Sequence, residues 1–145
     1  MTISIIKKKN GGVKVKGIYK LGFIIVLLLS GGLFAQNTSG IKVNEIAICT
    51  SVENRQPVGT DSVFTADAGK LYCFTGLTSQ SDTSEISHVW FYKGKEMAKI
   101  NLPVKGKSWH TWSAKTIMPA WKGSWKVEVQ DSNGNVISST SFRLK

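Results

Sequence analysis

The fold of this chain is decided by the stretch from Ser108 to Val129, which reads S-W-H-T-W-S-A-K-T-I-M-P-A-W-K-G-S-W-K-V-E-V. The stretch holds four of the five tryptophans and predicts two β-strands joined by a corner that contains proline and glycine. In the second strand, Trp125, Val127 and Val129 alternate with polar residues, which is the period of a half-buried strand. The stretch therefore indicates a domain built from β-strands.

The rest of the sequence continues this pattern of short strands and turns. Further strands are predicted over residues 41–52, 63–65, 70–77, 85–93, 96–102 and 135–144. The segment Asp131–Gly134 is the clearest hairpin signal, because Asn and Gly tolerate positive φ. Strand 85–93 has bulky residues on both faces, which predicts a central place in its sheet. We predict an antiparallel β-sandwich of seven or eight strands, immunoglobulin-like in the loose sense, with an open barrel as the alternative.

The first 35 residues differ in composition from the rest. Six lysines and no acidic residues precede residue 36, and Leu21–Phe34 is an apolar run without charge. A helix of that length reaches about 21 Å, short of the roughly 30 Å hydrocarbon core of a membrane. Ala35 is a small residue suited to cleavage, so we predict a secretory signal peptide over 1–35 and one β-sandwich domain over 36–145. Retention of this segment as an uncleaved anchor is the alternative.

The basic composition belongs mainly to this leader. The full chain has 19 basic and 9 acidic residues and a net charge of +10; without the six leader lysines, 13 basic residues remain and the net charge is +4. The remaining lysines are scattered along the sequence, so we expect no nucleic-acid partner. We expect an exported protein, periplasmic or secreted, that contacts a membrane only through an uncleaved N-terminal segment.

Two cysteines, Cys49 and Cys73, lie on predicted strands of the exported part. There we predict a disulfide, which stabilises by roughly 3 to 4 kcal/mol in the chain-entropy model. A pair of buried free thiols is the alternative. The cysteines and the two histidines, His88 and His110, lack the close spacing of zinc ligands, so we expect no metal and no cofactor.

Ser113 and Lys115 form one candidate site. They lie two residues apart on a strand, hence on one face and about 6 to 7 Å apart at Cα. A lysine beside a serine can activate it as a nucleophile, which would give a serine hydrolase. The sequence shows no oxyanion hole or cleft, and the competing interpretation is a polar pair whose lysine stem covers a tryptophan. We therefore expect no catalytic residue.

The aromatic residues form a second candidate site. Three tryptophans have the strand positions of core residues: Trp90, Trp109 and Trp125. Trp112 and Trp121 are less easily buried, and aromatic faces with polar neighbours suit sugar and peptide ligands. The candidate ligand-binding residues are Trp112, Trp121, His110 and Lys115. We predict a non-catalytic domain that binds an envelope glycan or protein, with a purely structural or assembly module as the alternative.

Three motifs occur in order along the chain: H-V-W-F-Y-K-G-K at His88–Lys95, W-H-T-W-S-A-K at Trp109–Lys115 and G-S-W-K-V-E-V-Q-D-S-N-G-N-V at Gly123–Val136. Together they resemble the bacterial family catalogued as domain of unknown function 2914, and the resemblance extends from about residue 47 to residue 144. His110 stands where members usually have arginine, and Ala114 where they often have serine. The resemblance implies an exported or envelope-associated β-rich domain and no known activity.

Overall fold

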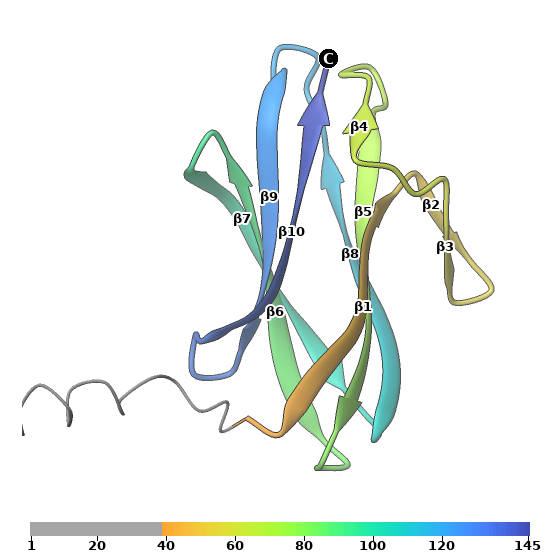
Figure 1. Ribbon diagram of the computed structural model, residues 1–145, viewed down its shortest axis with the longest axis vertical. Helices are drawn as coiled ribbons and strands as arrows, with labels where there is room; N and C mark the ends of the chain where they lie inside the picture. The colour runs from red at the N-terminus through yellow and green to blue at the C-terminus, as the bar shows by residue number, and fades with distance from the viewer. Residues whose placement is uncertain (1–38) are drawn as a thin grey trace, which may run out of the picture. The chain divides into compact units, whose positions relative to one another are not determined.

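The computed structural model describes residues 39–145, which form ten β-strands (Figure 1). A three-stranded sheet has the order β1 (Ile41–Cys49), β5 (Lys70–Ser79), β8 (Ser108–Thr116). A five-stranded sheet has the order β4 (Val63–Phe64), β10 (Val136–Leu144), β9 (Gly123–Asp131), β6 (Ser84–Tyr92), β7 (Lys95–Val104). A small hairpin contains β2 (Ser51–Glu53) and β3 (Gln56–Val58). All paired strands are antiparallel except β4 and β10.

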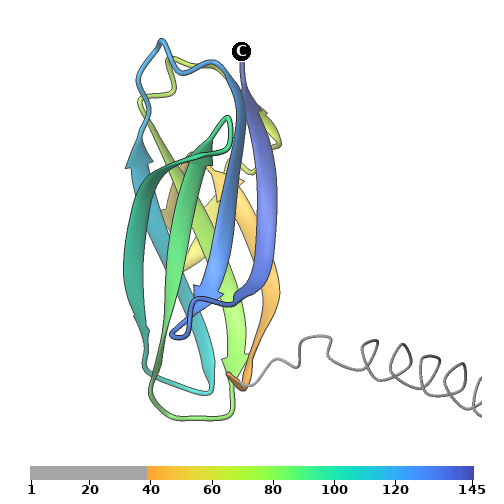
Figure 2. The same cartoon turned by 90° about the vertical axis from the view of Figure 1, so that its left-hand side faces the viewer.

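The two larger sheets pack face to face, with the five-stranded sheet in front of the three-stranded sheet in Figure 2. This confirms the predicted β-sandwich over the open barrel. Seven strands are nine or ten residues long, and three short strands bring the total to ten. As predicted, β6 is flanked on both sides, by β9 and β7. The predicted signal peptide lies outside the described residues, and residues 39–145 contain no helix long and apolar enough to span a membrane.

The core is filled by alternate residues of facing strands. On β9, Trp125, Val127 and Val129 are buried, and the polar residues between them point away from the core. Trp90 on β6 is fully buried, with its ring edge-on to Phe142 of β10 at 6.2 Å. The core positions predicted for Trp90 and Trp125 are therefore confirmed.

Two tight turns have left-handed backbone at both central residues, which is the geometry that suits hairpin twist. Lys93 and Gly94, with φ of 49° and 83°, connect β6 to β7. Asn54 and Arg55, with φ of 50° and 60°, connect β2 to β3. The sequence predicted a plain loop over residues 53–62, and this second hairpin was missed because neither central residue is glycine.

The predicted hairpin after β9 is confirmed and is organised around a buried carboxylate. Asp131 is 3% exposed, and its Oδ1 accepts hydrogen bonds from the backbone N–H groups of Asn133 and Asn135, each at 2.9 Å. Gly134 has φ of 84°, which L-residues with side chains seldom adopt. The turn therefore uses the residue types that predicted it.

The predicted disulfide is wrong, because Cys49 and Cys73 are both free, buried thiols. Cys49 lies opposite Tyr72 and Cys73 opposite Ile48, so the two side chains project to opposite faces of the sheet. A β-bulge between Val43 and Glu45 causes this arrangement. An extra residue in a strand reverses the side of the sheet to which every later side chain points. Burial raises the pKa of both thiols, which keeps them protonated and unreactive.

Candidate functional site

The β2–β3 hairpin links the beginning of the domain to the edge strand β8. Arg55, in the turn of this hairpin, donates a hydrogen bond from Nη2 to the backbone carbonyl of His110 at 3.2 Å. The Nδ1 of His110 lies 3.2 Å from the carbonyl oxygen of Arg55, which completes a reciprocal pair. The Arg55 guanidinium also lies over the ring of Trp109, 5.2 Å from its centroid. The hairpin therefore positions a cation beside the aromatic residues of β8.

A surface cleft of about 280 Å³ follows this edge of the sandwich. We call it the β8 cleft, and its lining residues come from the β2–β3 turn, from β7 and the turn after it, and from β8: Arg55, Pro103, Lys105, Trp109, His110, Thr111 and Trp112. Within residues 39–145, β8 is an edge strand that pairs with β5 alone, so the cleft borders a sheet edge on which Arg55 bonds to the carbonyl of His110. Its volume lies near the lower end of the roughly 300 to 1,000 Å³ typical of small-molecule sites.

The two tryptophans of the β8 cleft are held in different ways. Trp109 is half-buried and packs against a core cluster that includes Leu77, so its predicted core position is correct only in part. Trp112 is half-buried and lies nearly parallel to Phe74, with 6.4 Å between ring centroids. His110 packs edge-on to the same phenyl ring at 5.3 Å. Phe74 thus fixes two of the predicted ligand-binding side chains in place.

The other two predicted ligand-binding residues, Trp121 and Lys115, do not line the β8 cleft. The ammonium of Lys115 lies over the indole of Trp121 at 4.9 Å and donates a hydrogen bond to the carbonyl of Thr116. Trp121 in turn packs against Tyr92 and Trp125, with centroid distances of 6.5 and 5.9 Å. This confirms the interpretation in which the lysine covers a tryptophan, and it divides the four candidates into two separate groups.

Ser113 lies in the core, where a polar network joins the two large sheets. Its Oγ lies 2.7 Å from Nδ1 of His88 and accepts a hydrogen bond from Nε1 of Trp90 at 3.0 Å. The Nε2 of His88 lies 2.9 Å from Oγ1 of Thr75. Ser113 and Thr75 belong to the three-stranded sheet, and His88 and Trp90 belong to the five-stranded sheet. The imidazole therefore satisfies buried hydroxyl groups across the sandwich.

This network does not supply the proposed Ser113–Lys115 nucleophile. Ser113 is 4% exposed and His88 is fully buried, so a substrate has no access to either side chain. The Nζ of Lys115 is directed to Thr116 and Trp121. Burial lowers the pKa of His88 to about 4, and the network contains no carboxylate that would stabilise the imidazolium. Within residues 39–145, no group of three or more His, Cys, Asp or Glu side chains is placed to hold a metal.

The placement of Arg55 in the β8 cleft was not predicted, because its turn reaches β8 only in three dimensions. Lys105 lies in the turn directly before β8, but a single lysine in a turn does not indicate a cleft. Thr75 and Ser113 were detectable in principle, as small polar residues at inward positions of apolar strands. Such residues need buried partners, and His88 on the facing strand provides them. Turn residues carry no comparable pattern, which is why the cationic side of the cleft was missed.

Comparisons with solved structures give only distant likenesses. The first is a b-glucosidase, EmGH1, from Erythrobacter marinus, with 7% identity and a TM-score of 0.49 over 78% of this chain and 18% of that chain. The second is a GH3 beta-glucosidase from Bifidobacterium adolescentis, with 9% identity and a TM-score of 0.42 over 77% of this chain and 18% of that chain. This chain spans less than a fifth of either enzyme, and likeness at this level carries no argument about function.

Comparison by sequence is more specific. No curated protein matches the chain. Residues 83–144, from β6 to β10, match the family model described as "Protein of unknown function (DUF2914)". The match includes all three motifs that carry the resemblance, although it begins after the upstream limit near residue 47 that the sequence suggested. The segment from residue 83 to residue 144 therefore belongs to the DUF2914 family.

Proposed function

We propose that this protein is an exported, non-catalytic binding domain that holds a glycan of the cell envelope in the β8 cleft. The observation that carries the proposal is the placement of two half-buried indoles, Trp109 and Trp112, beside side chains that donate hydrogen bonds. An indole face offers a sugar ring a large, rigid contact area at low entropy cost. The residue composition of the cleft thus matches what binding of a sugar requires.

The polar groups of the β8 cleft favour a glycan rich in oxygen acceptors. Arg55 and Lys105 are cations, and none of the lining residues within 39–145 is acidic. Guanidinium and ammonium groups have donors and no acceptors, so they suit hydroxyl, carboxylate or sulfate oxygens. The Arg55 side chain already lies over Trp109 and bonds to His110, so it loses little conformational entropy when a ligand binds.

A glycan array probed with the full-length chain tests this proposal. We expect Trp112→Ala to weaken binding at least tenfold, because the indole face is lost, and Trp121→Ala to bind as the wild type does. Trp121 is the matched control, since its ring is half-buried outside the cleft. Urea unfolding of each variant verifies that the fold is kept. Equal binding by wild type and Trp112→Ala, or no bound glycan at all, would contradict the proposal and favour the structural or assembly module.

A further inference from the structure

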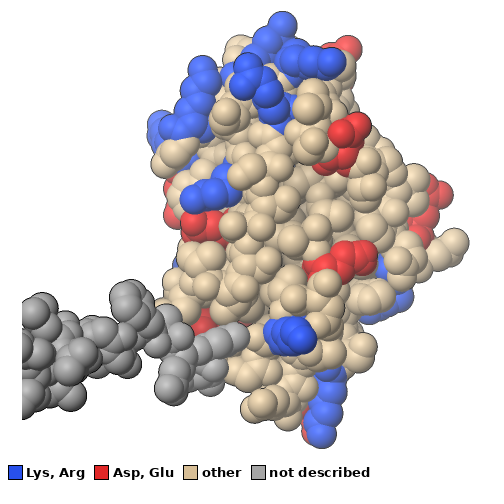
Figure 3. Space-filling view, in the orientation of Figure 1, with Lys and Arg blue, Asp and Glu red and all other residues tan. Residues whose placement is uncertain are grey.

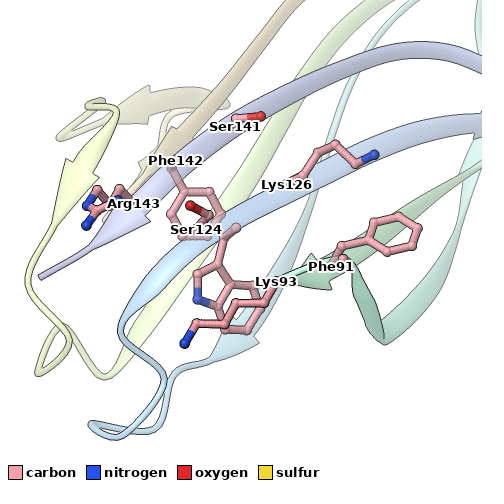
Figure 4. Close-up of a pocket in the computed structure, with 9 residues that line it drawn as sticks. Phe91, Lys93, Ser124, Lys126, Ser141, Phe142 and Arg143 are labelled. Atoms are coloured by element: carbon pink, nitrogen blue, oxygen red, sulfur yellow. The ribbon is translucent and has the colours of Figure 1, made fainter.

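A second and larger hollow lies on the outer face of the five-stranded sheet, beside the β6–β7 turn. Its volume is about 500 Å³, within the range of small-molecule sites, and it shares no residue with the β8 cleft. We call it the β9 pocket and define it by the polar and aromatic side chains that face it: Phe91, Lys93, Ser124, Lys126, Ser141 and Arg143 (Figure 4).

The β9 pocket exists because short side chains lie between long ones. Lys93 bonds through its backbone N–H to the carbonyl of Ser124, and Ser124 lies directly opposite Arg143 on β10. The three residues therefore form one row across the sheet, with the serine in the middle, and Figure 4 shows Lys93 and Arg143 on either side of it. A second row, two residues further along the strands, places Lys126 between Phe91 and Ser141. The short side chains of Ser124 and Ser141 therefore line the bottom of the pocket, and the longer cationic side chains line its sides.

The charge of the β9 pocket has one sign. Of the residues that the structure describes, three cations and no acidic residue line it. The antiparallel strands also bring other basic residues to this end of the domain, where Figure 3 shows Lys and Arg gathered near the C terminus. The cations at this end of the strands also include Lys70, Lys95, Lys122 and Lys145. An anion that approaches this end meets a positive potential before it makes any contact.

The cations differ in how far internal contacts already engage them. Lys126 is paired with Glu128 at 2.9 Å and lies over Phe91 at 5.0 Å. Lys93 lies over Tyr92 at 5.3 Å, and among residues 39–145 its ammonium has no ion-pair partner. Within residues 39–145 the Arg143 guanidinium makes no hydrogen bond or ion pair. Lys93 and Arg143, on opposite sides of the Ser124 hydroxyl, are therefore the principal donors.

We propose that the β9 pocket binds the phosphate group of a soluble phosphate ester. The lining combines an arginine fork, an ammonium group and serine hydroxyls, which are the kinds of donor that phosphate oxygens accept hydrogen bonds from. The pocket is larger than a bare anion requires, so the organic part of the ester lies towards Phe91. This site is independent of the glycan proposed for the β8 cleft.

Titration calorimetry of the full-length chain tests the proposal with glucose 6-phosphate, glucose and inorganic phosphate as probes. We expect glucose 6-phosphate to bind, phosphate to bind more weakly, and glucose not to bind at the β9 pocket. Arg143→Gln and Lys93→Asn should each weaken binding of glucose 6-phosphate about tenfold, since each removes a charge-assisted donor. Lys93→Asn keeps the fold, because asparagine tolerates the left-handed φ of 49° at this position.

The control is Lys99→Gln, which removes one charge from β7 of the same sheet outside the β9 pocket and should change binding less than twofold. Equal weakening by Lys99→Gln would overturn the proposal in favour of diffuse charge attraction. Absence of binding by glucose 6-phosphate would also overturn it. A third result would also contradict the proposal: the wild type binds phosphatidylglycerol vesicles, Arg143→Gln does not, and glucose 6-phosphate does not bind. The pocket would then bind a membrane surface.

Discussion

At the scale of single residues, His88 is a polar side chain held in the core by contacts across the two sheets. It is fully buried, and both ring nitrogens lie within hydrogen-bond distance of hydroxyl groups on the facing sheet. A neutral imidazole has one donor and one acceptor, and rotating hydroxyl groups can match either tautomer. A protonated ring would place an unpaired positive charge in the core, where desolvation is costly.

His88 therefore makes stability depend on pH. Its pKa is about 4 in the folded protein and near 6.5 when exposed, so the unfolded chain binds more protons between these values. Stability falls as pH decreases through this window, by about 2 kcal/mol between pH 7 and pH 5 and by about 3 kcal/mol once the pH is below 4. Urea unfolding at pH 7, 6 and 5 should show this loss for the wild type and not for His88→Gln.

The control for this prediction is His110→Gln, which should keep the pH dependence of the wild type because the His110 ring lies on the outer face beside Phe74. The chain has only these two histidines, so the pair of variants separates the buried ring from the surface ring. A wild type and a His88→Gln variant with parallel pH profiles would show that the buried imidazole accepts a proton without cost.

Residue alternation predicted which tryptophans fill the core, but it could not predict which residues of two strands meet. Trp90 and Trp125 follow from period-two patterns within their own strands. The side of the sheet to which Cys49 points depends instead on the bulge next to Asn44, where the sequence shows only an irregular alternation. Because of this extra residue, the two thiols project to opposite faces of the sheet. Register between strands is a tertiary property, and a single sequence fixes it weakly.

At the scale of elements, the corner between β8 and β9 brings together residues with unequal structural roles. Trp125 on β9 is 2% exposed, stacks on Phe142 at 5.8 Å and donates its Nε1–H to the carbonyl of Trp121. Trp121 in the corner is half-buried, and its ring contacts Tyr92, Trp125 and Lys115. The corner thus covers one end of the core without being part of its centre.

Truncation of these two tryptophans should have different costs. We expect Trp125→Ala to lower the free energy of unfolding by about 3 to 5 kcal/mol, through lost transfer energy and a cavity. Trp121→Ala should cost about 1 to 2 kcal/mol, because it removes aromatic contacts from a partly solvated ring and keeps the carbonyl that accepts the Trp125 hydrogen bond. Urea titrations of both variants measure the difference. A larger loss in Trp121→Ala would place the corner in the core.

The β2–β3 hairpin shows which kind of secondary-structure element is hard to predict from sequence. Its sequence, S-V-E-N-R-Q-P-V, contains the asparagine, proline and arginine of an ordinary loop, and its strands are three residues long. Its structural role arises from Arg55, whose hydrogen bond to His110 spans distant parts of the chain. Short elements whose stability comes from tertiary contacts carry little local signal. The contact of Arg55 with β8 was consequently not predicted from the sequence.

At the scale of the whole molecule, the predicted signal peptide remains the basis for export. We expect protein recovered from the exported fraction to begin at or near Gln36, because Leu21–Phe34 is too short to span a bilayer and Ala35 suits the cleavage position. Intact-mass measurement of that fraction checks the boundary. Recovery of the full 15.9 kDa chain from membranes would instead identify the segment as an anchor.

Charge is also a property of the whole molecule. The lysines beyond the leader are scattered in sequence, but the antiparallel strands return several of them to one end of the sandwich (Figure 3). Lys93 and Arg143 are 50 residues apart in the chain, yet both flank Ser124. Linear charge patterning therefore missed the β9 pocket for the same reason that it missed the cationic side of the β8 cleft.

The position of β10 has a consequence for the order in which the domain folds. This strand lies between β9 and β4, and its backbone bonds to both, including Arg143 N–H to Ser62 and Lys145 N–H to Phe64. It also supplies Phe142 and Leu144 to the core. During synthesis β4 emerges long before β10, so the five-stranded sheet lacks the strand that joins β4 to β9 until β10 has been made. The pairing of β4 and the packing of Phe142 and Leu144 can therefore stabilise the domain only after most of its residues have been synthesised.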